Sequence, residues 1–305
     1  IKRKNTPRYD LAILYEPGEV GAPTDQRGLK KFAQAAGKLG MSTTLITRDD
    51  YSRVAEFDAL FIRATTRVNH YTYRFARRAS AEGLVVIDDP HSIIRCSNKV
   101  FLAEGLARLK IPTPATLIVH KDNVDAIIPE LGLPCVLKEP DSAFSRGVYK
   151  ADTPAELSRL TSALFEQSDL LVAQAFVPTD FDWRIGILDG QPLYACRYYM
   201  ARQHWQIVKH SDTGGKPIEG DFDALTIEET PKQVIRTALR AAKMIGNGLY
   251  GVDLKQSGNR VYVIEVNDNP SIETRVEDKI LGDQLYARIM QIFLHRIEQR
   301  KQAAA

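Results

Sequence analysis

The sequence predicts an α/β protein whose first part is a parallel sheet with crossover helices and whose remainder combines helices with antiparallel hairpins. From Tyr9 to Pro90, short apolar segments alternate with helical stretches, which is typical of a doubly wound sheet. Farther along the chain, Asp189-Gly190 and Gly258 each separate two apolar segments, and such turn residues predict hairpins. The 305 residues, of which 44% are hydrophobic and 26% charged, are enough for a large core divided into two or three domains.

The first unit, residues 1–96, is predicted to be the doubly wound domain. Its strands are expected within 9–17, 41–47, 57–65 and 83–90, and its helices at 26–39 and 71–81. The stretch EPGEVGAPTDQRG follows the first strand, where a dinucleotide-binding domain would carry GxGxxG. This unit is therefore predicted to be a scaffold or to face the substrate, and not to bind a nicotinamide cofactor.

Two further units are predicted after residue 96. Residues 97–179 begin with a helix from Lys99 to Leu109, which ends at KIPTPAT because proline favours extended backbone before it. Strands in TLIVH, LPCVLKEP, VYKA and LLVAQAF follow, with helices near 122–130 and 154–167. Residues 180–305 contain the two hairpins, a helix from Thr230 to Ile245 between them, and a long helix from Glu277 to Lys301.

Composition excludes several classes of protein. Lys and Arg number 41 against 38 Asp and Glu, and the net charge of +3 is too small to indicate nucleic-acid binding. The three cysteines form no CxxC pair, so neither a disulfide framework nor a zinc site is expected, and a reducing, cytoplasmic location fits. No apolar run reaches the length of a membrane span. Since the sequence starts at Ile1 and not at Met, it leaves open whether an additional domain precedes Ile1. It also leaves open whether the protein forms a homo-oligomer.

Four oxygen-bearing side chains gather at the end of the last predicted strand, in VYVIEVNDNP. Glu265 and Asn267 lie two residues apart and therefore on one face of the strand. The hairpin around Gly258 would place Asp253 beside them, and three hard oxygen ligands of this kind suit magnesium. A polar strand end that faces solvent is the alternative, and Asp268 alone is expected to be a solvated or capping residue.

Lys138 ends an apolar strand and is followed at once by the loop DSAFSRG, which is rich in small polar residues. An ammonium group beside a run of backbone N–H donors can hold phosphate. A strand-end lysine is more often only solvated, and the GxxxxGK[ST] pattern is absent from the chain. The six histidines show no metal-binding spacing, and the absence of GxSxG argues against a serine hydrolase.

These features occur in a specific order along the chain, and that order resembles the ATP-grasp superfamily. Within it, the sequence is most similar to RimK-type amino-acid ligases and their glutathione-synthetase-like relatives, from about Ser97 to the C-terminus. GVDL followed by VIEVNDNPSIE is the most specific part of the resemblance. The other residues that carry it are Lys99, Lys138, the loop 141–147, the segment 174–177, Arg184 and Arg197. The resemblance implies an ATP-grasp fold, with residues 1–96 as a preceding Rossmann-like domain.

The resemblance also implies roles for individual residues. Lys99 and Lys138 would contact the phosphates of ATP. Asp253, Glu265 and Asn267 would hold one or two Mg²⁺ ions, with Glu265 as the bridge and Mn²⁺ able to substitute. The closing loop would use Ser142, Ser145, Arg146 and Gly147, and the adenine would be held by the backbone of Gln174, Ala175, Phe176 and Val177. Two departures stand out: Gly147 is the only glycine in the loop, and VKHSDTGG has Lys209 or His210 where the family has Asn.

The reaction that such parts perform is ATP-dependent joining of a carboxylate to an amine through an acylphosphate. Arg197 is predicted to be the catalytic cation over the developing negative charge, because a guanidinium stays charged and matches planar oxyanions. Arg184 and Arg275 are candidates for binding the substrate carboxylate. The partners would be a small molecule or peptide with a carboxylate and an amine co-substrate. A non-catalytic ATP-binding module and a phosphotransferase with the same nucleotide site are the alternatives.

Overall fold

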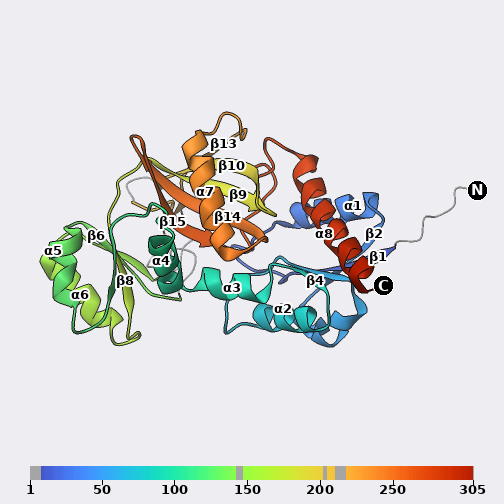
Figure 1. The fold of residues 1–305 in the computed structure, drawn as a ribbon, viewed down its shortest axis with the longest axis horizontal. Coiled ribbons are helices and arrows are strands. Elements are labelled where there is room, and N and C mark those ends of the chain that lie inside the picture. The colour runs from blue at the N-terminus through green and yellow to red at the C-terminus, as the bar shows by residue number, and fades with distance from the viewer. Residues whose placement is uncertain (1–7, 142–146, 202–204, 210–217, 305) are drawn as a thin grey trace, which may run out of the picture.

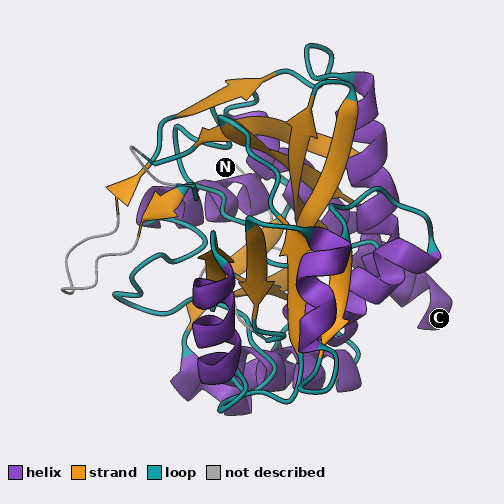
Figure 2. Cartoon of the chain, turned by 90° about the vertical axis from the view of Figure 1, so that its left-hand side faces the viewer, coloured by secondary structure: helices purple, strands orange, loops and turns teal. Residues whose placement is uncertain are grey.

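The computed structural model describes residues 8–141, 147–201, 205–209 and 218–304. It is elongated, with a parallel-sheet domain at one end, a small antiparallel sheet at the other, and a five-stranded sheet between them (Figure 1). The predicted α/β class is confirmed, since parallel and antiparallel sheets occur together with covering helices (Figure 2).

The first domain is a four-stranded parallel sheet in the order β2-β1-β3-β4. Alternate residues of β1 face opposite ways: Leu11 and Ile13 pack toward one set of helices, and Ala12 and Leu14 pack toward the other. This is the doubly wound arrangement predicted for this part of the chain. The elements are β1 (Tyr9–Leu14), α1 (Gln26–Lys38), β2 (Met41–Ile46), η1 (Arg48–Glu56), β3 (Ala59–Ile62), α2 (Tyr71–Ala81), β4 (Val85–Ile87) and α3 (Pro90–Ser97).

The second unit is an antiparallel sheet in the order β5-β8-β6-β7 with two helices packed on its core face. The helix expected at 122–130 is divided into a 3-10 turn and a short α-helix that ends at Gly132, whose φ of 70° terminates it. The elements are α4 (Lys99–Arg108), β5 (Thr116–Val119), η2 (Val124–Ala126), α5 (Ile127–Leu131), β6 (Cys135–Lys138), β7 (Val148–Ala151), α6 (Pro154–Leu164) and β8 (Leu171–Ala175).

The third unit is built on an antiparallel sheet in the order β13-β10-β9-β14-β15. Both predicted hairpins are present: Asp189 and Gly190 have positive φ between β9 and β10, and Gly258 turns the chain between β14 and β15. The elements are β9 (Phe181–Leu188), β10 (Gln191–Tyr199), β11 (Val208–Lys209), β12 (Ile218–Glu219), β13 (Phe222–Leu225), α7 (Lys232–Ile245), β14 (Leu249–Ser257) and β15 (Arg260–Asn267). Helices α4 and α7 cover one face of this sheet.

The C-terminal helix α8 (Asp283–Ala304) packs on the first domain, although the sequence placed it with residues 180–305. Tyr286, Ile289 and Phe293 join the core formed by β1, α1 and β3. The helix also begins six residues later than predicted. Before it, the buried carboxylates of Glu277 and Asp278 accept from the backbone N–H groups of residues 273 and 275 and so stabilise a series of turns.

Arg63, at the end of β3, joins the first domain to the end of β15. Its side chain is 1% exposed, and its guanidinium donates to Thr24, Asn269 and the carbonyl oxygens of Pro23 and Pro270. The first domain thus fixes the chain directly after Asn267.

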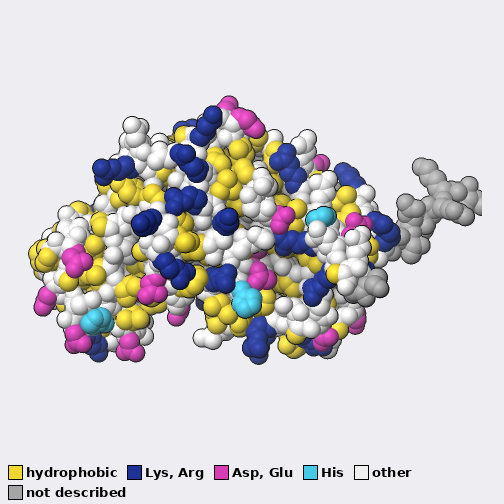
Figure 3. Space-filling model, in the orientation of Figure 1, with side chains coloured by type: hydrophobic (Ala, Val, Ile, Leu, Met, Phe, Trp, Pro, Cys, Tyr) yellow, Lys and Arg dark blue, Asp and Glu magenta, His cyan; other side chains and the backbone are white. Residues whose placement is uncertain are grey.

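Lys and Arg side chains gather on the face that carries α4 and α7 (Figure 3). Helix α7 contains no acidic residue, and its Lys232, Arg236, Arg240 and Lys243 are exposed. The near-neutral balance of the whole chain therefore conceals a locally basic surface. In the part of the chain that the structure describes, no helix is long and apolar enough to cross a membrane.

Candidate functional site

Strand register brings the predicted metal ligands onto one face of the five-stranded sheet. Asp253 lies directly opposite Glu265 on one side and opposite Arg184 on the other, while Asn267 lies opposite Gly251. Residues directly opposite each other share a face, so these side chains all project the same way, away from α7. A Cβ at Gly251 would come within 2.8 Å of Pro270, so glycine is needed there for the chain to fold back over the site.

Asp253 is paired through both of its carboxylate oxygens. Arg184 Nε lies 2.7 Å from Oδ1 and Arg184 Nη2 lies 2.8 Å from Oδ2, which is a bidentate ion pair. Asn267 Nδ2 donates to Oδ2 at 3.1 Å. The two charged side chains are 21% and 13% exposed, so the pair is only partly screened by solvent.

Glu265 is paired with Lys99, the first residue of α4. The Nζ–Oε1 distance is 3.2 Å, and the lysine side chain is 7% exposed. Burial pushes the pKa of Glu265 upward, but the charges of Lys99 and Lys138 outweigh it and hold the pKa below its usual value. Lys99 sits there because Asn98 caps the helix by accepting from the backbone N–H of Phe101.

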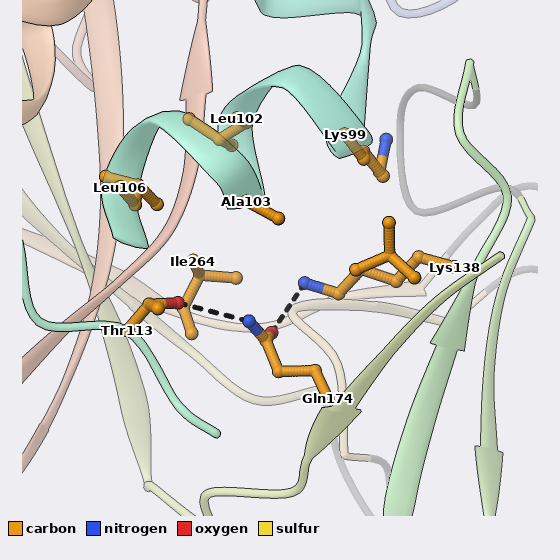
Figure 4. Close-up of a pocket in the computed structure, with 9 residues that line it drawn as sticks. Lys99, Leu102, Ala103, Leu106, Thr113, Lys138, Gln174 and Ile264 are labelled. Carbon is orange, nitrogen blue, oxygen red and sulfur yellow. Dashed lines mark hydrogen bonds between the residues drawn. The ribbon is translucent and has the colours of Figure 1, made fainter. Parts of the chain in front are cut away.

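A pocket lies between α4, β6 and β8 (Figure 4), and it is lined in part by Lys99, the ion-pair partner of Glu265. Lys138 Nζ donates to Gln174 Oε1 at 2.8 Å, and Gln174 Nε2 donates to Thr113 and Thr116. Burial lowers the pKa of Lys138 to about 8. Apart from Lys99, the remaining lining is apolar, and it comes from Leu102, Ala103, Leu106, Val172 and Ile264. An apolar wall with two lysines at one end suits a planar ring attached to an anion.

Part of the predicted adenine contact is already used within the protein. The backbone N–H of Ala175 donates to Ala115 O at 2.8 Å, and that of Phe176 donates to Pro134 O at 3.2 Å. These two amides are therefore engaged, and adenine would use other groups of 174–177. The ring of Phe176 lies 4.8 Å from Lys150 Nζ and packs edge-on against Trp205.

The predicted closing loop is anchored at both ends. Glu139 N donates to Gly147 O, Lys99 N donates to Pro140 O, and Gly147 has a φ of 67°. Ser142, Ser145 and Arg146 lie outside the described residues, as does His210. The roles assigned to them stay predictions.

Arg197, the predicted catalytic cation, lies on the opposite face of the sheet. It is opposite Trp183 and Asp223, and it forms a bidentate ion pair with Asp223 at 2.9 and 2.6 Å. A bulge between Pro192 and Tyr194 causes this, because one extra residue in a strand reverses the direction of every later side chain. The structure therefore does not bring Arg197 to the predicted metal ligands. Arg184 is the arginine that the structure places beside Asp253.

The structure does not bring Arg275 to the carboxylates. It is exposed, with a φ of 75° in the turns before α8, and no contact between its side chain and Asp253, Glu265 or Asn267 occurs in the described part of the chain.

Three further polar groups on the site's face were missed. Lys255 and Asp182 form an ion pair at 2.6 Å, and Tyr198, whose ring packs under Arg184, donates to Glu277. Burial raises the pKa of Glu277 to about 7. Lys255 could have been found, since it follows Asp253 by two residues on the same strand. Tyr198 could not, because the bulge in β10 leaves no clear signal in the sequence.

The donor set fits magnesium, although it holds only two carboxylates. Among the described residues, no three His, Cys, Asp or Glu side chains come together as a metal-binding group. Asp253, Glu265 and the amide oxygen of Asn267 nevertheless share one face, and Mg²⁺ is commonly held by one or two carboxylates together with substrate phosphates.

Comparison with known proteins decides the family. The model of the RimK-like ATP-grasp domain matches residues 96–292, which is more than half of the chain. The chain belongs to the RimK-like ATP-grasp family. The predicted family is thus confirmed, and ATP with Mg²⁺ is the usual requirement of ATP-grasp proteins.

Relatives of this RimK-like ATP-grasp protein are ligases. An alpha-aminoadipate–LysW ligase, LysX, of Saccharolobus solfataricus is 31% identical over 204 residues, covering 64% of this chain and 69% of the relative. A probable alpha-L-glutamate ligase of Thioalkalivibrio sulfidiphilus is 26% identical over 221 residues, covering 71% of this chain and 70% of the relative. The D-alanine–D-alanine ligase of Bacillus anthracis has a similar structure, with a TM-score of 0.70 at 18% identity, covering 97% of this chain and 99% of that chain.

Proposed function

We propose that the protein is an ATP-dependent carboxylate–amine ligase that forms an amide bond through an acylphosphate. The observation that carries the proposal is the common face of Asp253, Glu265 and Asn267, next to a pocket that contains Lys99 and Lys138. This combination offers two anionic ligands for a cation and two cations for a triphosphate at one place. Family membership supports the same reaction class.

The protein's own groups would bind and orient the reactants. Lys99 and Lys138 pair the phosphates, and the apolar wall at Leu102 and Ile264 takes the adenine ring. When bound at Asp253, Glu265 and Asn267, magnesium neutralises charge on the transferring phosphoryl group. We propose two ions with Glu265 as the shared ligand, and Mn²⁺ as a substitute for Mg²⁺.

Each chemical step forms one bond and breaks one bond. An oxygen of the substrate carboxylate attacks the γ-phosphorus, and the bond from that phosphorus to ADP breaks. The amine nitrogen then attacks the acyl carbon, phosphate leaves, and the nitrogen loses a proton. Arg184 replaces Arg197 as the cation proposed for the developing negative charge, because Arg184 lies on the face of the sheet that carries Asp253, whereas Arg197 lies on the opposite face.

We propose that the acid is an amino acid and that the amine belongs to an amino acid or a peptide. The names of the relatives support this class, since they include a glutamate ligase and a ligase that acts on α-aminoadipate and LysW. Arg275 remains a candidate for binding the substrate carboxylate, because it is exposed a few residues beyond Asn267.

A screen of amino-acid pairs for ADP release, with mass spectrometry of the products, tests the proposal. The expected product has the combined mass of acid and amine less one water, and it requires ATP. Glu265→Gln is the control and should form no product. A product that carries phosphate on a hydroxyl group, or ATP binding without any product across the amino-acid panel, would overturn the ligase proposal.

A further inference from the structure

The charges at the site are balanced by the chain's own side chains. Asp253 is held by Arg184, Glu265 by Lys99, and Asp182 by Lys255, with Nζ–O or N–O distances of 2.6 to 3.2 Å. The charge of Lys138 acts on Glu265 as well. Among the described residues, the three carboxylates of these pairs thus face four cationic side chains. A single divalent cation that approaches them meets no excess of negative charge from these seven side chains.

The pairing of Asp253 is the strongest obstacle to such a cation. Arg184 uses two donors in a fork that matches both carboxylate oxygens, and the pair is mostly buried. A metal ligand must present an oxygen lone pair to the ion. Coordination by Asp253 therefore competes directly with Arg184 for the same oxygens.

A nucleotide changes this balance. Its phosphates are an alternative partner for Lys99 and Lys138, which face the same pocket, and they add negative charge beside Glu265. When these lysines pair with phosphate, the carboxylates of the site become available as ligands of a metal ion. Phosphate oxygens then complete the coordination of that metal ion.

From these contacts we infer that Arg184 is a positioning residue that couples metal binding to nucleotide binding, by occupying Asp253 until the triphosphate arrives. The ion then enters only with the nucleotide, and Arg184 is released toward the reacting carboxylate. This inference rests on the proposed function for the identity of the nucleotide, but it concerns metal affinity and not turnover. It assigns to Arg184 a task before the chemical step.

The chain provides a matched control. Arg197 also forms a bidentate ion pair, with Asp223, on the strand next to that of Arg184, but on the opposite face of the sheet. Arg197→Gln removes the same charge and the same kind of ion pair as Arg184→Gln, without freeing a predicted metal ligand.

The experiment measures Mn²⁺ binding by electron paramagnetic resonance and by calorimetry, with no nucleotide, acid or amine present. The unaltered protein should bind Mn²⁺ weakly, and a non-hydrolysable ATP analogue should raise its affinity strongly. Arg184→Gln should bind Mn²⁺ alone about tenfold or more tightly than the unaltered protein, because a competing charge in contact with Asp253 is gone. Arg184→Lys keeps the charge and should stay close to the unaltered protein, and Arg197→Gln should not differ from it.

Thermal unfolding gives a second readout if Arg184→Gln is destabilised, since a ligand that binds only the folded protein raises Tm. Mn²⁺ without nucleotide should then raise the Tm of Arg184→Gln more than that of Arg197→Gln. Tight binding of Mn²⁺ by the unaltered protein alone, equal gains in both glutamine variants, or no gain in Arg184→Gln would each overturn the inference. Failure to find an acid and an amine would refute only the ligase proposal, because neither is used here.

Discussion

Lys138 should make the binding of ATP depend on pH in the mildly alkaline range. Its side chain is 8% exposed, and burial lowers its pKa to about 8 from the usual 10.5. A lysine binds phosphate through its charged form. The group is therefore charged below pH 8 and increasingly neutral above it, so the affinity for ATP should fall as the pH rises through 8.

The expected size of the effect follows from the pKa. At one pH unit below the pKa almost all of the lysine is charged, and at one unit above it only about a tenth is charged. The dissociation constant of ATP should thus rise about tenfold between pH 7 and pH 9. Lys138→Ala should weaken binding at pH 7 by about 1–3 kcal/mol, the usual value of a hydrogen bond to a charged group.

Calorimetric titration with ATP at pH 7, 8 and 9 measures both effects on one preparation. Lys138→Arg is the control, because a guanidinium stays charged throughout this range and should give nearly constant affinity. Constant affinity for ATP in the unaltered protein, or the same pH dependence in Lys138→Arg, would show that deprotonation of Lys138 does not weaken the binding of ATP. Unchanged affinity in Lys138→Ala would show that it does not contact them at all.

Three other substitutions test the remaining assignments. Arg197→Gln should destabilise the fold by about 1 kcal/mol, because its ion pair with Asp223 is partly exposed. The same variant should keep kcat/KM within about twofold of the unaltered protein. An unchanged Tm with a strongly reduced kcat would instead place Arg197 in the active site. Arg63→Met should lower the free energy of unfolding, measured by urea denaturation, by about 3–5 kcal/mol. The reason is that the oxygen atoms of Asn269 and of the other buried acceptors lose a charged donor. A loss below about 1 kcal/mol would contradict the structural role of Arg63. Glu265→Gln should reduce ADP formation about 10²- to 10³-fold with an unchanged circular dichroism spectrum, and turnover near the normal rate would remove Glu265 from the metal site.

Local sequence signals predicted most elements of the fold, because each depends on residues close together in the chain. Tyr71–Ala81 was predicted to the residue, and the Asp189-Gly190 and Gly258 turns are where the sequence placed them. The short strands β11, β12 and β13 and the helix α3 were missed, since segments this short carry no periodicity of their own. The packing of α8 on the first domain was missed for a different reason. The sheet on which it packs is decided by contacts between distant parts of the chain, such as those of Tyr286 and Phe293 with the core of the first domain.

The site depends on two bulges that the sequence does not reveal. In β15, Ile264 is an extra residue between the partners of Asp253 and Leu254, so that Asp253 lies opposite Glu265; in a regular hairpin it would lie opposite Ile264. The same bulge turns Ile264 into the pocket between α4, β6 and β8. The prediction of the metal ligands did not require the bulge, since it used only proximity within a hairpin.

The second bulge explains why the prediction for Arg197 differs from the structure. Without the extra residue near Pro192, Arg197 would lie opposite Asp182, on the face that carries Arg184 and Asp253. With it, Tyr198 takes that place, and Arg197 turns toward Asp223. Both arginines have a bidentate carboxylate partner on a neighbouring strand, so neither charge nor pairing distinguishes them. What distinguishes them is the direction in which the side chains of β10 point, and a single inserted residue decides which arginine lies on the face that carries Asp253.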